Sequence, residues 1–426
     1  MATDTVSTIL TSALLGALSL GACAAGNGQT GTSPAVSQGA STAAVVQAPQ
    51  PRNFAEWKAG FRTRALEAGI APATFDRAFA GVELNEKVIS LDGRQPEFTR
   101  PIWEYLDGAV SESRIATGRA QADAKRSVLN QIESRYGADY EAVLAIWGLE
   151  SGFGSNFGSI PVIESMATLA YEGRRKKFAE EQLIAALRIL QAGDIEPGQM
   201  VGSWAGAMGH TQFIPTSFLS YAVDFTGDGR RDLWAADAQD ALASTANYLG
   251  RFGWTRGSPA VVEVVLPEGF DYALADDSTR MTAAEWRALG VRAMEGRLAM
   301  GDEMISILLP AGARGPAFAA YPNFRVIKRY NNSTSYALAV AKLADRIKGG
   351  PGIKAAWPRG DRPLSLTEKK DLQERLTALG FDTQGVDGII GPNSRKAVRG
   401  FQQANGLLPD GYVSASLLDA VRRAGG

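Results

Sequence analysis

Helical periodicity between residues 53 and 252 restricts the body of this 426-residue chain to a mainly helical fold. Apolar residues recur there at i, i+3 and i+4, the spacing of amphipathic helices. The segments with this spacing are 53–68, 72–80, 115–136, 139–151, 178–192 and 238–252. Short β-type runs follow at 261–266, 304–309 and 324–327, and residues 335–348 return to helical spacing. The sequence therefore predicts an α+β body that is mainly α, with a small β insertion.

Two stretches of biased composition divide the chain. Residues 24–51 are mostly small or polar and contain no charged residue, which predicts a flexible tether. Gly349, Gly350, Pro351 and Gly352 interrupt the helical pattern and separate two parts of the chain. We expect a main domain at residues 52–350 and a C-terminal domain at residues 361–426.

An apolar run at residues 9–23 ends at Cys23, the only cysteine in the chain. The run is too short for a membrane-spanning helix but has the length of a signal-peptide core. The residues 20–23, Leu-Gly-Ala-Cys, resemble the bacterial lipobox, so we expect residues 1–23 to be a signal peptide with lipidation at Cys23. In such lipoproteins, an alanine like Ala24 goes with outer-membrane sorting. A plain secretory signal cleaved near Ala22 or Ala24 is the alternative, since no Lys or Arg precedes the run.

The numbers of titratable residues limit the chemistry. Lys and Arg total 44 and Asp and Glu total 45, so the formal net charge of -1 makes nucleic acid an unexpected partner. A single cysteine and a single histidine exclude an intrachain disulfide and any metal site built from several of these residues. Catalysis would therefore depend mainly on carboxylates, hydroxyls and amides.

Glu150 lies near the end of the predicted helix 139–151, on the same face as Ile146 and Trp147. Desolvation on an apolar face would raise its pKa, as a general acid requires. Spacing alone favours a simpler interpretation, a Glu at a frayed helix end that reaches solvent or an Arg. The context favours the first interpretation, because residues 202–218 and 330–336 combine aromatic, hydroxyl and amide side chains. Such combinations are typical of sugar-binding surfaces.

Several blocks of the body together resemble the lytic murein transglycosylase B family, lysozyme-like enzymes that cleave peptidoglycan. The blocks are residues 147–154, 202–218, 222–234, 243–249 and 329–336. The resemblance implies that Glu150 is the single catalytic acid/base. The residues for which it implies substrate binding are Ser203, Gln212, Tyr248, Tyr330, Asn331, Tyr336 and Arg175. His210 is expected to be a surface side chain beside the cleft.

The resemblance also implies a reaction. It is cleavage of the β-1,4 bond between N-acetylmuramic acid and N-acetylglucosamine, with formation of a 1,6-anhydro end and no required cofactor. Ordinary glycosidases use two carboxylates, whereas here the C6 hydroxyl of the sugar would attack C1. The implied partners are peptidoglycan glycan strands and, through the lipid anchor, the membrane, at the periplasmic side of the outer membrane or otherwise soluble in the periplasm. A hydrolytic muramidase, a non-catalytic wall-binding scaffold and additional cell-wall synthesis or remodelling partners remain open.

A loop that begins at residue 224 has the ligand spacing of an EF-hand, with a glycine at its sixth position. The twelfth position is Ala235 instead of Glu, so Asp237 or Asp240 would have to close a longer loop. The candidate calcium ligands are Asp224, Thr226, Asp228, the backbone carbonyl of Arg230, and Asp240. A structural calcium site and a calcium-free Asp/Gly turn are both consistent with this pattern.

The C-terminal domain resembles the small three-helix peptidoglycan-binding domain of many cell-wall enzymes. Residues 387–394 and 397–402 carry the match. Its apolar stripe of Leu372, Leu376 and Leu379 would also fit other small helical bundles with glycine turns. Beside a domain of the transglycosylase type, we predict that it retains the protein on the cell wall and so raises the local concentration of substrate.

Overall fold

The computed structural model describes residues 51–93, 100–298 and 302–425. The predicted signal peptide, the lipidation site at Cys23 and the tether up to residue 50 lie outside these ranges. The described residues contain seventeen α-helices and two small sheets, which confirms the predicted mainly helical fold with a β insertion. No helix in these ranges is long and apolar enough to cross a membrane.

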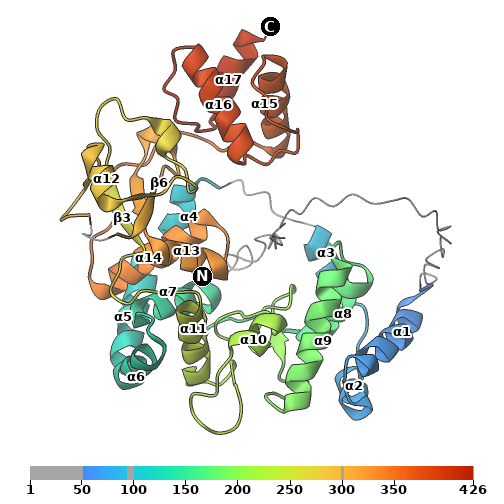
Figure 1. The fold of residues 1–426 in the computed structure, drawn as a ribbon. Helices are drawn as coiled ribbons and strands as arrows, with labels where there is room; N and C mark the ends of the chain where they lie inside the picture. Colours follow the sequence, from blue (N-terminus) through green and yellow to red (C-terminus); the bar gives the residue numbers. More distant parts are fainter. Residues whose placement is uncertain (1–50, 94–99, 299–301, 426) are drawn as a thin grey trace, which may run out of the picture.

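Thirteen helices build the main body (Figure 1). They are α1 (Phe54–Glu67), α2 (Pro72–Ala78), α3 (Glu86–Gly93), α4 (Ile102–Ala109), α5 (Glu112–Ala124), α6 (Arg126–Tyr136), α7 (Tyr140–Ser151), α8 (Val162–Tyr171), α9 (Lys176–Ala192), α10 (Pro215–Tyr221), α11 (Gln239–Arg251), α13 (Pro322–Tyr330) and α14 (Thr334–Lys348). Helix α7 is the central one, since α5, α6, α11 and α14 all pack against it. Its side chains are buried over nearly its whole length, so a polar residue on α7 lies inside the protein.

Two predicted elements of the body were wrong. The segment 115–136 is not one helix, because α5 ends at a non-helical Lys125 before α6 begins. Residues 324–327 are not a strand but lie in α13. A run of four residues that contains Phe324, Val326 and Ile327 does not distinguish a strand from a helix. Pro322 at the first turn and the basic Lys328 and Arg329 in the last turn are the helix signals that decide for α13.

The β insertion is an antiparallel sheet with its own hydrophobic core. Its strands are β3 (Val261–Val265), β4 (Met281–Thr282), β5 (Arg292–Ala293), β6 (Met304–Leu308) and β7 (Ala317–Ala320), in the order β4-β6-β7-β3-β5. Trp286 of α12 (Ala283–Ala288) is fully buried beneath the sheet and donates from Nε1 to the Ile305 carbonyl at 2.9 Å. A second, two-stranded sheet pairs β1 (Ile160–Pro161) with β2 (Val201–Gly202) in the body.

The C-terminal domain is a three-helix unit, α15 (Leu366–Ala378), α16 (Pro392–Ala404) and α17 (Ala415–Ala424). Its core includes Leu372, Phe401 and Val421 and is separate from the cores of the body and the sheet. In Figure 1 these helices lie beside the β insertion. Asp410 accepts a hydrogen bond from the Ala313 backbone at 3.0 Å, which joins the C-terminal domain to the β insertion.

Candidate active site

The last turn of α7 places Glu150 inside the protein. The helix ends at Ser151, and Gly152 follows in the left-handed region with φ at 60°, which an L side chain adopts only with strain. The Glu150 side chain is only 8% exposed. The predicted desolvation of this carboxyl is therefore confirmed, and the interpretation as a solvent-exposed Glu at a frayed end is wrong. Packing of α14 against α7 is the reason, since it covers the helix end.

Tyr336 is the hydrogen-bond partner of Glu150. Its hydroxyl donates to Glu150 Oε1 at 2.6 Å. The ring is held in the first turn of α14, where the Ser333 side chain caps the helix by accepting from the Tyr336 backbone. Burial raises the pKa of Glu150 to about 8, and the hydrogen bond from Tyr336 opposes this rise. A carboxyl with such a pKa keeps its proton at neutral pH and can donate it to a bound molecule.

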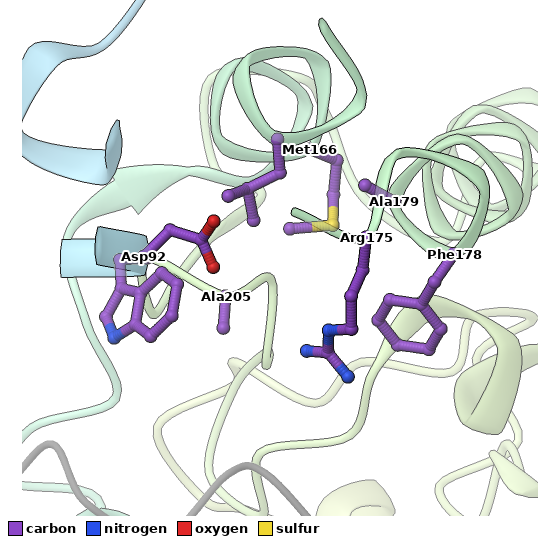
Figure 2. Close-up of a pocket in the computed structure, with 8 residues that line it drawn as sticks. Asp92, Met166, Arg175, Phe178, Ala179 and Ala205 are labelled. Atoms are coloured by element: carbon purple, nitrogen blue, oxygen red, sulfur yellow. The ribbon is translucent and has the colours of Figure 1, made fainter. Parts of the chain in front are cut away.

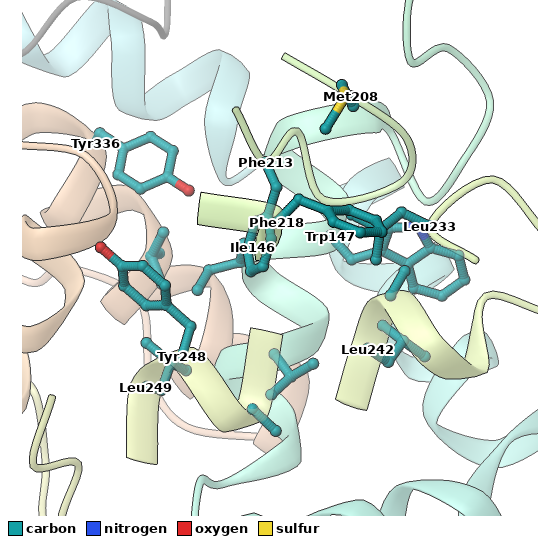
Figure 3. Close-up of a cluster of buried hydrophobic side chains, with 14 of the residues drawn as sticks. Ile146, Trp147, Met208, Phe213, Phe218, Leu233, Leu242, Tyr248, Leu249 and Tyr336 are labelled. Carbon is teal, nitrogen blue, oxygen red and sulfur yellow. The ribbon is translucent and has the colours of Figure 1, made fainter. Parts of the chain in front are cut away.

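Two further tyrosines form an aromatic wall behind this pair. Tyr248 of α11 and Tyr330 at the end of α13 pack edge to face, with ring centroids 5.0 Å apart. The Tyr248 hydroxyl donates to the Arg329 carbonyl at 2.6 Å, and the Tyr330 hydroxyl donates to the Thr211 carbonyl. Figure 3 shows Tyr248 and Tyr336 at one end of the buried cluster that surrounds α7. Because both hydroxyls of the wall bind backbone carbonyls, its rings have fixed positions.

Asn331 follows the wall directly. Its side chain is 9% exposed, and Oδ1 accepts from the Ser333 backbone at 3.0 Å. This bond orders the turn between α13 and α14. The structure thus brings Tyr330, Asn331 and Tyr336 together on one turn beside Glu150.

The glycine-rich loop between β2 and α10 carries Ser203 and Gln212. Ser203 Oγ accepts from the Ala205 and Ala207 backbones at 3.3 and 3.1 Å. Gln212 Nε2 donates to the carbonyls of Phe157 and Gly209 at 3.1 and 2.9 Å. Both side chains are half-buried and hold the loop in shape. The loop is tied to the aromatic wall through Thr211, the acceptor of Tyr330.

Arg175 lies in a separate pocket, shown in Figure 2. The pocket is lined by Asp92, Met166, Leu169, Arg175, Phe178, Ala179, Trp204 and Ala205. The Arg175 guanidinium lies over the Phe178 ring, 4.7 Å from its centroid. Since Trp204 and Ala205 follow Ser203 in the chain, the pocket adjoins the loop of the candidate site.

Tyr105 is a member of the site that the sequence analysis missed. It lies on α4, and burial together with the nearby Glu150 carboxylate raises the pKa of Tyr105 to about 12. Apolar spacing at Ile102, Trp103 and Leu106 could have predicted the helix. No local signal relates Tyr105 to Glu150, because only the packing of α4 against α14 brings them together.

His210 was expected at the surface, and this prediction was wrong. The side chain is 4% exposed and packs against the rings of Trp147 and Phe157. Trp147 Nε1 donates to His210 Nδ1 at 3.1 Å. The imidazole is buried because Trp147 and the Ala235 carbonyl supply hydrogen-bond partners for both of its ring nitrogens.

The acidic loop between α10 and α11 brings three carboxylates together. Ligand oxygens of Asp224, Asp228 and Asp240 lie within 4.8 Å of one another. Asp240 also accepts from the backbones of Phe225 and Thr226, at 2.9 and 3.1 Å. These bonds order the loop as an Asp/Gly turn would require.

Other predicted ligands of this loop lie close by. The Thr226 hydroxyl donates to Asp224 Oδ1 at 3.4 Å, and the Arg230 backbone donates to Asp228 Oδ1 at 2.9 Å. Asp237 is not part of the three-carboxylate group and instead accepts from the Gln239 side chain at 2.7 Å. Of the two acidic residues considered for closing the loop, the structure therefore places Asp240 beside Asp224 and Asp228.

Comparison with protein families matches both parts of the chain. Residues 53–345 match the transglycosylase SLT domain, and residues 367–421 match a peptidoglycan binding domain. The chain is 33% identical over 249 residues to membrane-bound lytic murein transglycosylase B of Escherichia coli (strain K12). That alignment spans 57% of this chain and 66% of the relative, slightly less than two thirds of the relative's length.

Two solved structures illustrate the structural similarity. The crystal structure of SltB3 from Pseudomonas aeruginosa in complex with NAG-anhNAM-pentapeptide is 53% identical, with a TM-score of 0.85. The match covers 87% of this chain and 100% of that one. The Escherichia coli lytic transglycosylase Slt35 in complex with calcium is 26% identical, with a TM-score of 0.59, over 68% of this chain and 92% of that one.

Substitution Glu150→Gln is expected to stabilise the protein in a pH-dependent manner. The native state keeps the proton of Glu150 up to about pH 8, whereas the unfolded chain loses it near pH 4.5. The free energy of unfolding of the parent therefore falls as pH rises through this window. The variant lacks this loss, so its advantage should grow to an order of a few kcal/mol at about pH 9. Calorimetric melting at several pH values measures it.

A second variant sharpens this measurement. Tyr336→Phe removes the hydrogen bond that opposes the rise in the Glu150 pKa. Glu150→Gln introduced into the Tyr336→Phe variant should therefore give a larger pH-dependent gain in stability, relative to Tyr336→Phe alone, than Glu150→Gln gives relative to the parent. A difference between Glu150→Gln and the parent that stays constant with pH would contradict the raised pKa.

Proposed function

Because the chain belongs to the transglycosylase SLT domain family, we propose that it is a lytic transglycosylase that cleaves peptidoglycan. The bond cleaved is the β-1,4 bond between N-acetylmuramic acid and N-acetylglucosamine. The observation that carries this proposal is a buried Glu150 whose pKa is raised to about 8 and whose partner is the Tyr336 hydroxyl. In the described residues, no second carboxylate contributes to the pKa of Glu150.

A single carboxyl can serve both halves of the reaction. Glu150 donates its proton to the glycosidic oxygen as the bond from that oxygen to C1 of the muramyl residue breaks. The acetamido group of the same sugar stabilises the cationic C1. The carboxylate then takes the proton of the C6 hydroxyl, and O6 bonds to C1 to close the 1,6-anhydro ring. No water is consumed, and Glu150 ends protonated, ready for another cycle.

The hydrogen bond from Tyr336 assigns roles to the two carboxyl oxygens. Oε1 accepts from the Tyr336 hydroxyl, so Oε2 is the oxygen that we assign to the scissile bond. The same hydroxyl stabilises Glu150 after the proton has left, when the burial of a charged carboxylate costs free energy. Tyr336 thus lowers the energy of the ionised Glu150, whereas burial keeps Glu150 protonated before the reaction.

The remaining site residues are proposed to hold the glycan. The tyrosine wall offers ring faces for stacking on sugars, and Asn331, Ser203 and Gln212 offer amide and hydroxyl groups for sugar hydroxyls and acetamido groups. Arg175, in its pocket with Asp92, would bind an acidic or polar part of the strand outside the scissile bond. A relative that is 53% identical was crystallised with NAG-anhNAM-pentapeptide, which supports a product with an anhydro end.

The C-terminal domain is proposed to bind the cell wall. It matches the peptidoglycan binding domain over residues 367–421, and weak binding there would suffice to raise the local concentration of strands. We also propose that Cys23 carries a lipid that holds the protein on the periplasmic side of the outer membrane. The name of the Escherichia coli relative, a membrane-bound transglycosylase, supports attachment to a membrane.

Calcium is proposed as a structural ion of the acidic loop. Carboxylate oxygens are the ligands that Ca²⁺ prefers, and those of Asp224, Asp228 and Asp240 converge within 4.8 Å. Thr226 and the Arg230 carbonyl would complete the ligand set. The ion would neutralise the mutual repulsion of the carboxylates and stabilise the loop, with no part in the bond cleavage. A relative that is 26% identical was crystallised in complex with calcium, which supports this assignment.

Digestion of purified peptidoglycan tests the reaction. We expect fragments that are lighter by one water than hydrolytic products and resist borohydride reduction, as mass spectrometry would show. Glu150→Gln should lower the rate by at least about 10³-fold, since it removes the only proposed acid/base. Reducible muramic ends would indicate a hydrolytic muramidase instead. Absence of fragments from the parent protein would indicate a wall-binding scaffold.

The rate should also depend on pH in the sense that the raised pKa predicts. The protonated carboxyl starts the reaction, so kcat on soluble glycan oligomers should be constant near neutrality and fall as pH rises through about 8. Initial rates between pH 5 and pH 10, with folding checked by circular dichroism at each pH, measure this limb. A fall centred near the ordinary Glu pKa of about 4.5 would contradict the proposed acid.

Calcium should raise the melting temperature of the parent protein, and a chelator should reverse the effect. Binding at 100 times the dissociation constant corresponds to about 2.7 kcal/mol. Asp228→Asn should abolish most of the shift, because it removes an exposed cluster carboxylate. Asp237→Asn is the matched control, an exposed carboxylate of the same loop outside the cluster. Equal calcium shifts for both variants would argue against the site.

A further inference from the structure

His210 connects the helix of Glu150 to the loop that precedes α11. On one side of its ring, Trp147 Nε1 donates to Nδ1 at 3.1 Å, and Trp147 lies one helical turn before Glu150. On the other side, Nε2 lies 2.9 Å from the Ala235 carbonyl. The His210 side chain is only 4% exposed, and its bond with Trp147 is buried.

The two partners allow one protonation state of the ring. An indole N–H can only donate and a carbonyl can only accept, so Nδ1 must be bare and Nε2 must carry the proton. A doubly protonated imidazolium would direct an N–H of Nδ1 at the N–H of Trp147. The neutral Nε2–H form of His210 is therefore part of the native geometry.

The backbone of His210 contacts the same helix end. Its carbonyl accepts from Ser151 Oγ at 2.6 Å, and Ser151 Oγ accepts in turn from the Gly154 backbone at 3.0 Å. A Cβ added at Gly154, whose φ is 84°, would lie 2.4 Å from His210 Cε1. The turn after Glu150 is thus packed directly on the imidazole. Trp147, before Glu150 in the chain, and Ser151, after it, are both hydrogen-bonded to His210.

We propose that His210 is a positioning residue for Glu150: its neutral imidazole holds Trp147 and, with its backbone, the end of α7, so that the carboxyl meets Tyr336 and the scissile bond. This inference rests on the proposed catalytic role of Glu150. It assigns to the only histidine of the chain a function in which it never touches the substrate. Errors of about 1 Å in such positions can cost about 100-fold in rate, which is the scale of the expected effect.

The charged groups around His210 determine how the contact responds to pH. Lys125, at the end of α5, and Asp232 and Asp237, in the loop before α11, are the charged residues that act on the ring. Lys125 donates to the Asp237 carbonyl at 2.8 Å and lies over the Trp147 ring. Burial lowers the pKa of His210, so the neutral form persists at neutral pH. Acidification should protonate the ring, break the bond from Trp147 and lower kcat.

Three variants of the full chain test this proposal with soluble glycan oligomers. His210→Phe keeps a ring but loses both side-chain hydrogen bonds, so kcat should fall about 10- to 100-fold with little change in KM. His210→Asn keeps an acceptor near the position of Nδ1, so it should recover most of kcat and lose the decrease at acid pH. Trp147→Phe removes the donor of the same bond, and its effect should not add to that of His210→Phe.

Trp286→Phe is the matched control, since it removes a fully buried indole hydrogen bond in the separate core of the β insertion. It should lower the melting temperature while kcat of the folded protein stays unchanged. Parent-like kcat in folded His210→Phe, or effects of His210→Phe and Trp147→Phe that add, would overturn the positioning role. If His210→Phe does not fold, the recovery in His210→Asn and its pH profile decide. Failure of the proposed function is recognised separately, by a parent protein that releases no fragments or by full activity of Glu150→Gln.

Discussion

The burial of one carboxyl group is the constraint on which the rest of the structure depends. Glu150 lies on α7, against which α5, α6, α11 and α14 pack, and it would destabilise the protein if it were ionised without support. Burial raises the pKa of the carboxyl so that it stays protonated, and the Tyr336 hydroxyl donates a hydrogen bond to it. The energetic cost of burial and the chemistry of an acid that stays protonated near neutral pH thus have the same physical origin.

Elements that are distant in sequence hold this carboxyl in place. α14 provides Tyr336, α4 provides Tyr105, and the wall of Tyr248 and Tyr330 comes from α11 and α13. From Trp147, one helical turn before Glu150, hydrogen bonds through His210 to Ala235 reach the loop that also carries the acidic cluster. Tyr248, Tyr330 and His210 bind backbone carbonyls, Trp147 binds His210, and Tyr336 binds Glu150. These bonds order the site before substrate arrives.

Much of the fold was predictable because apolar residues recur at a characteristic spacing in amphipathic helices. The segments 53–68, 72–80, 139–151, 178–192, 238–252 and 335–348 were predicted in this way, whereas α3, α4, α8 and α10 were missed. The motif around Glu150 led to the candidate acid. The errors occurred where the local sequence pattern is ambiguous or gives no signal. Residues 324–327 are too few to distinguish a strand from a helix, and no local pattern around His210 indicated that its side chain is buried. Tyr105 had no signal, since its relation to Glu150 exists only in three dimensions.

The amino-acid sequence by itself determined the helical body, the separate C-terminal domain, the family resemblance and the choice of Glu150, because these follow from residue type and spacing along the chain. Tertiary structure alone decided how far Glu150 is buried, that Tyr336 is its partner, and that Asp240 rather than Asp237 joins the acidic cluster. It also decided that His210 lies beneath the helix end. Solvation and hydrogen bonding depend on which distant segments meet, and no local pattern contains that information.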